Sequence, residues 1–242
     1  MQVVIFCGGK GTRIRDVSEV IPKPMLPIGG KPILSHIMDT YAHFGYKDFI
    51  LCLGYKGEVI KNYFLNRGDV LVTPEKIEFL DKRDFNITMV ETGEAAHTGE
   101  RLKIASKYIT GKRFMLTYGD GVGNIDIDKL LAFHKSHGKP LTITGVHPPG
   151  RFGELSVSEN DVTFKEKPQT EGLINGGFFV IEKEFLDYLD GNPLENEPLQ
   201  RCAEDGEMKV YIHDGYWQPM DTMREYNMLN DLWESGERPW RQ

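Results

Sequence analysis

The sequence predicts an α/β protein with a mixed, mainly parallel central sheet. Over the first half of the chain, apolar runs with strand character alternate with amphipathic helical stretches, a pattern typical of βαβ units. After Pro140 the pattern changes to short strands separated by Pro-Pro-Gly and Asn-Asp turns, which indicates a β-rich insertion. No internal repeat, linker or low-complexity tract divides the chain. We therefore predict a single domain over residues 1–242, with one part at about 1–140 and another at about 141–242.

The first half supplies the elements expected of a parallel sheet. Predicted strands cover 3–6, 49–53, 87–90 and 114–118, and predicted helices cover 33–44, 57–65, 98–109 and 126–137. Gly45 stands where the first helix needs its C-terminal cap. The stretch from Asn66 to Asp84 is polar and contains Gly68 and Pro74, so we expect an irregular surface loop or an oligomer contact there.

The second half is predicted to be richer in strands. We expect strands at 141–147, 153–157, 161–166, 176–181 and 208–213, and helices at 195–205 and 222–235.

Composition limits the partners of the chain. The 29 basic and 36 acidic residues give a net charge of −7 without a block of like charges, so neither nucleic acid nor an anionic membrane is an expected partner. Cys7, Cys52 and Cys202 are odd in number and widely spaced, which favours reduced thiols in a cytoplasmic protein. No apolar stretch approaches the roughly 18 residues of a membrane span, and no signal-peptide pattern is present.

The most informative segment is Cys7-Gly8-Gly9-Lys10-Gly11-Thr12-Arg13, which follows the first predicted strand. Open α/β sheets bind ligands at the carboxyl ends of their strands. A glycine-rich turn brings backbone N–H groups close to anionic oxygens. Because Lys10, Arg13 and Lys23 add three cations, the segment predicts a polyphosphate site.

Two common phosphate-binding motifs do not fit this segment. The dinucleotide fingerprint G-x-G-x-x-G needs a third glycine where Ile14 stands. The Walker loop needs a glycine five residues before a Gly-Lys pair, and none of the Gly-Lys pairs in the chain has one. A nicotinamide-dependent dehydrogenase is therefore disfavoured.

Two aspartates far apart in the sequence are candidate metal ligands. Asp120 lies between two glycines after a buried strand, and Asp221 precedes the last predicted helix. A Mg²⁺ ion bound to substrate phosphates usually takes one or two carboxylates. From the pattern alone, Asp120 also fits an ordinary Asp-Gly turn, and Asp221 also fits a helix N-cap.

Three further segments carry candidate binding residues. Thr98-Gly99-Glu100-Arg101 begins a predicted helix, where free N–H groups and Arg101 could hold an anion; the alternative is a surface arginine paired with a glutamate. Glu166-Lys167-Pro168 ends a strand and Asn175-Gly176-Gly177 begins another. These two segments could offer a lysine and an amide to a phosphorylated acceptor, and structural glycines in a hairpin are the alternative.

Together these segments resemble the sugar-phosphate nucleotidyltransferase family over essentially the whole chain. The loop up to Arg13 and Pro22-Lys23-Pro24-Met25 are similar to segments shared across the family. Three strings resemble the branch of glucose-1-phosphate cytidylyltransferases, or CDP-glucose pyrophosphorylases: Thr117-Tyr118-Gly119-Asp120-Gly121, Pro148-Pro149-Gly150-Arg151-Phe152-Gly153 and Trp217-Gln218-Pro219-Met220-Asp221-Thr222.

The resemblance implies a Rossmann-like nucleotidyltransferase fold, CTP as the nucleotide, Mg²⁺ as the cofactor, and transfer to a phosphorylated acceptor such as glucose 1-phosphate with release of pyrophosphate. It implies that Arg13 and Lys23 are catalytic, that Asp120 and Asp221 hold the metal, and that Lys167, Asn175 and Gly176 bind the acceptor. The implied nucleotide-binding residues are Phe6, Gly8, Gly9, Lys10, Gly11, Thr12, Arg13, Lys23, Thr98, Arg101 and Gly119. A homo-oligomer is also expected.

The sequence departs from the family pattern at three places. Cys7 replaces a small alanine, Glu100 replaces a glycine, and the region from Asn66 to Phe85 is shorter than the family's insertion. The last difference leaves open another acceptor, either a different sugar phosphate or a non-sugar phosphate used for a surface polysaccharide. A regulatory homologue without turnover is a further alternative, but binding alone does not require both Asp120 and Asp221.

Overall fold

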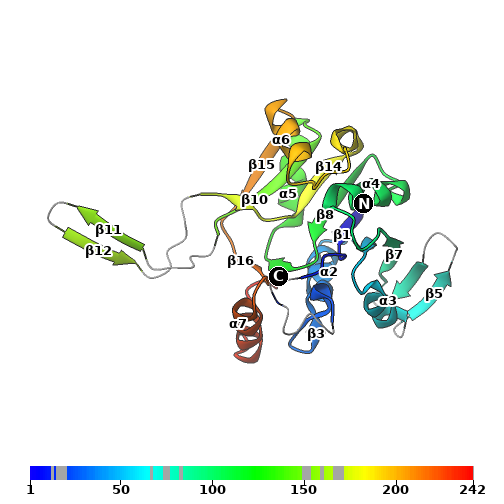
Figure 1. Ribbon diagram of the computed structural model, residues 1–242, viewed down its shortest axis with the longest axis horizontal. Helices are drawn as coiled ribbons and strands as arrows, with labels where there is room; N and C mark the ends of the chain where they lie inside the picture. Colours follow the sequence, from blue (N-terminus) through cyan, green and yellow to red (C-terminus); the bar gives the residue numbers. More distant parts are fainter. Residues whose placement is uncertain are drawn as a thin grey trace.

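The computed structural model describes residues 1–11, 14, 21–65, 68–72, 77–81, 84–148, 154–158, 161–165 and 172–241. Its centre is a ten-stranded mixed sheet in the order β13-β10-β14-β8-β1-β4-β7-β6-β5, with β15 also paired to β10 (Figure 1). The strands are β1 (Gln2–Phe6), β4 (Asp48–Leu53), β5 (Gly68–Val72), β6 (Ile77–Asp81), β7 (Asn86–Glu91), β8 (Arg113–Tyr118), β10 (Leu141–Val146), β13 (Ile174–Asn175), β14 (Phe179–Glu182) and β15 (Met208–His213).

The middle of the sheet is parallel and its flanks are mixed. Strands β8, β1, β4 and β7 run parallel to their neighbours in this group, whereas β14 pairs antiparallel with β8 and β6 pairs antiparallel with β7. These pairings confirm the predicted α/β class with a mixed sheet around a parallel centre.

Helices pack on both faces of the sheet. They are α2 (Ile33–His43), α3 (Gly57–Leu65), α4 (Thr98–Ala105), α5 (Ile127–His137), α6 (Glu197–Glu204) and α7 (Met223–Glu234), with 3₁₀ turns η2 (Lys23–Met25), η3 (Ser106–Tyr108) and η4 (Lys183–Tyr188). Alternate residues of β1 point to opposite faces, so Val3 and Ile5 join one core and Val4 and Phe6 the other. The first core includes residues of α2, α3, α5 and α7, and the second includes residues of α4, α6 and η4.

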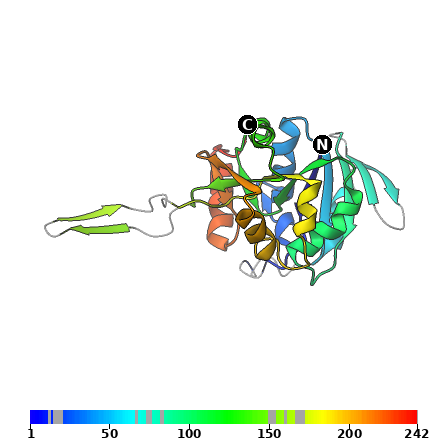
Figure 2. The same cartoon turned by 90° about the horizontal axis from the view of Figure 1, so that it is seen from above.

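Three small two-stranded sheets complete the described part of the chain. They are β2 (Pro27–Ile28) with β3 (Lys31–Pro32), β9 (Gly121–Gly123) with β16 (Trp217–Pro219), and β11 (Glu154–Ser158) with β12 (Asp161–Lys165). In both views the β11–β12 hairpin extends away from the rest of the molecule (Figures 1 and 2). This hairpin confirms the two strands expected in the β-rich part near residues 153–166.

The structure corrects two expectations about the elements. The stretch from Asn66 to Asp84 is not an irregular loop, because β5 and β6 extend the main sheet there. The apolar groups Val70-Leu71-Val72 and Ile77 to Leu80 carry strand propensity, which the glycine, the proline and the charged residues around them obscured. The strand expected at 176–181 begins only at Phe179, because Gly177 has a φ of +74° and turns the chain before it.

Two other sequence expectations concern membranes and cysteines. Within the described part of the chain, every helix is too short or too polar to cross a lipid bilayer. Cys7, Cys52 and Cys202 are all buried and none forms a disulfide. Burial raises the pKa of Cys52 and of Cys202 to about 12, so both thiols stay protonated and unreactive at neutral pH.

Candidate functional site

The parallel pairing of β1 and β8 brings two loops together at the carboxyl ends of these strands. Phe6 and Tyr118, the last residues of the two strands, are partners in the register. The amide of Gly119 donates to the carbonyl of Phe6 at 3.0 Å. A Cβ at Gly119 would lie 2.6 Å from that carbonyl oxygen, so the close approach requires glycine. The glycine-rich loop and the Gly119-Asp120-Gly121 turn therefore lie side by side, as the sequence predicts.

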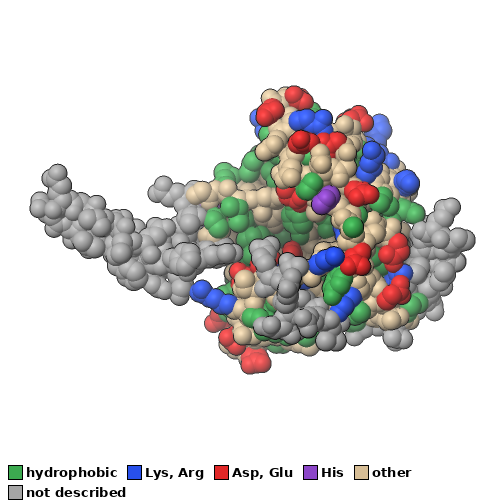
Figure 3. Space-filling model, viewed as in Figure 1, with side chains coloured by type: hydrophobic (Ala, Val, Ile, Leu, Met, Phe, Trp, Pro, Cys, Tyr) green, Lys and Arg blue, Asp and Glu red, His purple; other side chains and the backbone are tan. Residues whose placement is uncertain are grey.

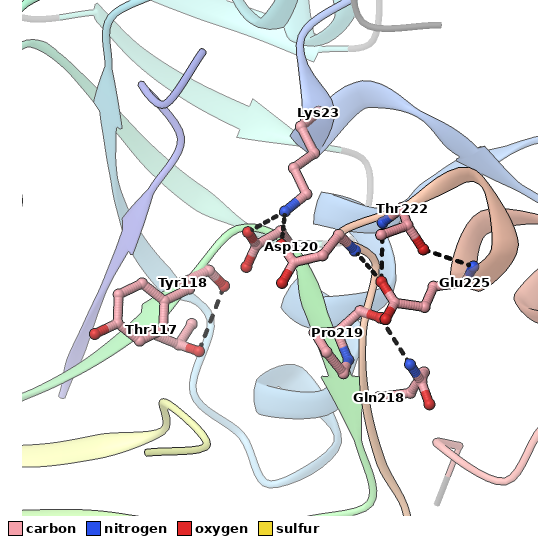
Figure 4. Close-up of polar contacts among 9 residues, drawn as sticks. Lys23, Thr117, Tyr118, Asp120, Gln218, Pro219, Thr222 and Glu225 are labelled. Atoms are coloured by element: carbon pink, nitrogen blue, oxygen red, sulfur yellow. Dashed lines mark hydrogen bonds and ion pairs between the residues drawn. The ribbon is translucent and has the colours of Figure 1, made fainter. Parts of the chain in front are cut away.

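Lys23 joins the two predicted metal ligands. Its ammonium nitrogen lies 2.6 Å from Oδ2 of Asp120 (Figure 4). It also lies 2.6 Å from Oδ1 of Asp221. Burial alone would lower the pKa of Lys23, but the two carboxylates outweigh burial and raise that pKa above its ordinary value. Lys23 is thus a buried cation held between two anions that lie far apart in the sequence.

A small sheet places Asp221 beside Asp120. Strand β16 pairs antiparallel with β9, and Pro219 is the register partner of Gly121. The amide of Met220 then donates to the carbonyl of Asp120 at 2.8 Å. This pairing brings the carboxylate of Asp221 to the same point as that of Asp120.

Asp221 is not the N-cap of the last helix, although the sequence allowed that role. The N-cap is Thr222, whose hydroxyl accepts from the amide of Glu225, while the Glu225 carboxylate accepts from the amide of Thr222 (Figure 4). The Glu225 carboxylate also accepts from the amide of Asp221 at 2.6 Å. Because the cap uses a different side chain, the Asp221 carboxylate can face the Lys23 ammonium.

These residues border a cavity of about 370 Å³. The residues that line it are Phe6, Gly9, Gly11, Lys23, Pro24, Ala96, His97, Thr98, Arg101, Tyr118, Gly119, Asp120, Pro193, Glu195 and Asp221. The face shown in Figure 3 is hollowed near its centre, and acidic and basic side chains lie around the hollow. Nine of the lining residues are predicted site residues: Phe6, Gly9, Gly11, Lys23, Thr98, Arg101, Gly119, Asp120 and Asp221.

Arg101 lies beneath the glycine-rich loop and is only 4% exposed. Its guanidinium donates to four neutral oxygens, the carbonyls of Leu53 (3.1 Å), Gly8 (3.0 Å) and Glu94 (3.4 Å) and the hydroxyl of Thr92 (2.6 Å). A Cβ at Gly8 would lie 2.0 Å from Nη1 of Arg101, so the loop can rest on the guanidinium only with glycine there. The alternative of a surface arginine paired with a glutamate is therefore wrong. Since its partners are neutral, the charge of Arg101 adds to the attraction of the loop for an anion.

A hydrogen-bonded wall closes another side of the cavity. The hydroxyl of Thr98 donates to Oε2 of Glu195, and the hydroxyl of Tyr118 donates to Oε1 of the same carboxylate, both at 2.6 Å. The Thr98 hydroxyl also accepts from the amide of Leu194 at 2.8 Å. Burial, with the Glu195 charge next, raises the pKa of Tyr118 above its ordinary value, so the phenol remains a donor.

The remaining predicted residues lie off the cavity wall or outside the described residues. Lys10 is exposed and pairs with Glu94 at 3.4 Å. Asn175 donates from Nδ2 to the hydroxyl of Tyr118 at 3.1 Å, and the carbonyl of Gly176 accepts from Nε1 of Trp217 at 2.8 Å. Thr12, Arg13 and Lys167 lie outside the described residues.

The sequence interpretation missed Tyr118 and Glu195 as wall residues. Tyr118 had a signal, because it directly precedes Gly119-Asp120 at the end of a buried strand. Glu195 had no signal in the sequence, because it is one of several acidic residues in a polar segment. Its place beside the cavity depends on how residues 192–195 pack on the start of α4, where a Cβ at Gly99 would lie 2.2 Å from the carbonyl oxygen of Asn192.

The carboxylate pair fits the predicted Mg²⁺. Asp120 and Asp221 direct hard oxygen donors at a single cation, which in this structure is the ammonium of Lys23. Among the described residues, no group of three or more His, Cys, Asp or Glu side chains could hold a metal. Two carboxylates with substrate phosphates and water are the ligand set that Mg²⁺ uses at phosphate-transfer sites.

A glycine-rich loop, a buried lysine and two convergent carboxylates at the edge of an α/β sheet form a site suited to binding phosphate groups and a divalent cation. Residues 2–233 match the family model described as Nucleotidyl transferase, and the chain belongs to this family. The chain is 47% identical over 254 residues to the glucose-1-phosphate cytidylyltransferase of Salmonella typhi, and the alignment covers 100% of this chain and 99% of that protein.

Other relatives act on other nucleotides or define the fold. The D-glycero-alpha-D-manno-heptose 1-phosphate guanylyltransferase of Campylobacter jejuni is 35% identical, with 93% of this chain and 97% of that protein covered. The crystal structure of HddC from Yersinia pseudotuberculosis is 28% identical with a TM-score of 0.72, covering 96% of this chain and 99% of that one. The same protein has also been solved in complex with GMP-PN.

Proposed function

We propose that this protein is a cytidylyltransferase that condenses CTP with a phosphorylated acceptor, glucose 1-phosphate being the first candidate, to give a CDP-linked product and pyrophosphate. The observation that carries this proposal is the convergence of Lys23, Asp120 and Asp221 on the cavity. The full-length similarity to a glucose-1-phosphate cytidylyltransferase supports the choice of nucleotide and acceptor.

The reaction needs no nucleophile from the protein. An anionic oxygen of the acceptor's phosphate attacks the α-phosphorus of CTP and forms the new P–O bond, while the bond to the bridging oxygen breaks and pyrophosphate leaves with its electron pair. The backbone amides of the glycine-rich loop and Lys23 bind the phosphates and offset the charge that develops during transfer. A Mg²⁺ ion held by Asp120 and Asp221 would neutralise the triphosphate and help to align it.

We assign the acceptor to the β-rich part. Lys167, Asn175 and Gly176 remain the proposed acceptor-binding residues, and Asn175 contacts the cavity wall through Tyr118. Replacing Lys167 with Ala should raise the KM for the acceptor and leave the affinity for CTP nearly unchanged. Loss of CTP binding with unchanged acceptor binding would contradict this division into a part at about 1–140 for the nucleotide and a part at about 141–242 for the acceptor and metal.

The deciding experiment supplies the protein with each of the common nucleoside triphosphates, Mg²⁺ and a panel of phosphorylated acceptors, and measures pyrophosphate. Release only with CTP and glucose 1-phosphate supports the full proposal. Release with CTP and a different sugar phosphate or a non-sugar phosphate keeps the chemistry and changes the acceptor. Binding of CTP without release under any condition would instead identify a regulatory homologue.

Three further expectations accompany this proposal. We expect a homo-oligomer, which light scattering after size exclusion would test. We expect a cytoplasmic location, since all three thiols are buried and unpaired. We also propose Arg13 as a second catalytic cation beside Lys23, and Arg13→Ala should then lower kcat as Lys23→Ala does.

A further inference from the structure

A chain of hydrogen bonds connects the nucleotide side of the cavity to the proposed acceptor side. Glu195 accepts from Thr98 and from Tyr118, and Tyr118 accepts from Asn175. The Tyr118 ring is held between two aromatic rings, with its centroid 6.1 Å from that of Phe6 and 5.9 Å from that of Phe179. The packing of the ring therefore fixes the position of the Tyr118 hydroxyl, and the hydrogen bonds fix its partners.

The direction of every hydrogen bond in this chain follows from chemistry. A carboxylate only accepts, so the single proton of the Tyr118 hydroxyl is used by Glu195. The hydroxyl can then only accept from Asn175, which must present its NH₂ group. On the other side, the amide of Gly177 can only donate, and it donates to Asn175 at 2.8 Å, which identifies the atom there as Oδ1.

We propose that Glu195 and Tyr118 are positioning residues that fix the orientation of the Asn175 amide, so that Asn175 offers an N–H donor to the acceptor substrate. This inference rests on the proposed function, because it takes Asn175 as an acceptor-binding residue. Among the described residues, the second N–H of Asn175 has no hydrogen-bond partner. It matches an oxygen of the acceptor, either a phosphate oxygen or a hydroxyl group that accepts.

According to this proposal, Glu195, which lies on the nucleotide side of the cavity, should affect binding of the acceptor. Without the Glu195 carboxylate, the Tyr118 proton is free to turn toward Asn175, where it meets an N–H group. Rotation of the amide would relieve that conflict, but it would bring the NH₂ group against the amide of Gly177. A glutamine at position 195 still offers a carbonyl oxygen to Tyr118, so it should preserve the orientation that alanine destroys.

The kinetic test uses the full chain with CTP, Mg²⁺ and whichever acceptor gives pyrophosphate. Glu195→Ala should raise the acceptor KM by about tenfold, the loss expected for one hydrogen bond, with a much smaller change in the KM for CTP. Glu195→Gln should restore most of the loss. In an Asn175→Ala background, Glu195→Ala should add no further change in acceptor KM, because the group that it orients is already absent.

A second readout does not depend on turnover. The side-chain amide signals of Asn175 in a ¹⁵N NMR spectrum, assigned by their absence in Asn175→Ala, should move in Glu195→Ala and return in Glu195→Gln. Glu204→Gln, an exposed change on α6 away from the cavity wall, is the matched control and should leave both readouts unchanged.

The outcomes separate this inference from the proposed function. An inactive wild-type protein would overturn the function, while the Asn175 signals would still report on the hydrogen-bond chain. The inference is wrong if those signals are the same in Glu195→Ala as in the wild type. It is also wrong if Glu195→Ala changes only the KM for CTP, or changes the acceptor KM equally with and without Asn175.

Discussion

The ammonium of Lys23 separates two carboxylates that would repel each other in its absence. Both lie 2.6 Å from its nitrogen, and the Lys23 side chain is only 9% exposed. A buried cation in this position can be retained only because its partners are charged, since burial without them would favour the neutral amine. The same pairing places a cation on the wall of the cavity, where the proposed substrate phosphates would bind.

Lys23→Ala should lower kcat by roughly a hundredfold or more, because a group that stabilises the charge of the transition state acts on kcat. Steady-state kinetics with CTP and acceptor both varied would measure the effect. Lys61→Ala, which removes a lysine paired with Glu58 and Glu91 away from the cavity, is the control and should retain activity. A change confined to the KM for CTP would mean that Lys23 only binds the nucleotide.

At the scale of elements, two adjacent residues at the start of α7 have different roles. Thr222 caps the helix, and Asp221 faces Lys23. Thr222→Ala should lower the free energy of unfolding by about 1 kcal/mol, the usual contribution of an N-cap, and change turnover little. Asp221→Asn should abolish most turnover because the amide keeps the shape of the carboxylate but not its charge.

Chemical denaturation and pyrophosphate release, measured on both variants, test this separation. An Asp221→Asn protein that stays active but unfolds more easily would show that Asp221 serves the fold and that the metal needs another ligand.

Helix α2 carries a buried histidine that should make stability depend on pH. His36 is 2% exposed, bonds the carbonyl of Ile28 at 3.0 Å and packs on Trp233 and Trp240. Burial lowers the pKa of His36 to about 4, and the nearby charges of Lys31, Asp39 and Arg241 partly cancel. The unfolded chain, with the ordinary histidine pKa, therefore binds a proton before the folded chain does as the pH falls, so stability is lost below about pH 6.5.

When the pH falls from about 7.5 to about 5, His36 should lower the free energy of unfolding of the wild type by about 2 kcal/mol. The His36→Gln variant should not show this loss. Urea denaturation at the two pH values measures the difference. His43→Gln, an exposed change on the same helix, should follow the wild type. An unchanged pH dependence in His36→Gln would mean that the folded protein can accept the charge at this position.

Elements with strong local patterns were predictable, and those that depend on distant partners were not. Helix α3 covers the residues expected from its periodicity, because one face of it is apolar. Strands β5 and β6 were missed because short strands with charged and flexible residues gain their stability from pairing with β7 rather than from their own sequence. The short strands β9 and β16 have no local signal, yet they place Asp221 beside Asp120.

At the scale of the whole molecule, the cavity combines residues that lie far apart in the chain. The sequence predicts nine of the residues that line this cavity, because the glycine-rich loop, Lys23 and the two aspartates stand in recognisable motifs. It does not predict that Tyr118 and Glu195 join Thr98 in the wall, because these polar residues acquire that role only when the segment at 192–195 packs on α4. Ligands that bridge the cavity should therefore stabilise both halves against unfolding.

This architecture predicts that metal and nucleotide bind cooperatively. In the protein alone, Lys23 occupies the position between Asp120 and Asp221, so Mg²⁺ must compete with a tethered cation. We expect the phosphates of CTP to give Lys23 another anionic partner and so to release the carboxylates for the metal. Mg²⁺ alone, or CTP with EDTA, should therefore change the Tm little. The two together, at about a hundredfold excess over Kd, should add about 2.7 kcal/mol of stability. Turnover should stop in EDTA and return with Mg²⁺ or Mn²⁺.

In Lys23→Ala the competing cation is gone, so Mg²⁺ alone should raise the Tm more than in the wild type. Equal responses of the two proteins to Mg²⁺ would show that the metal does not use this carboxylate pair.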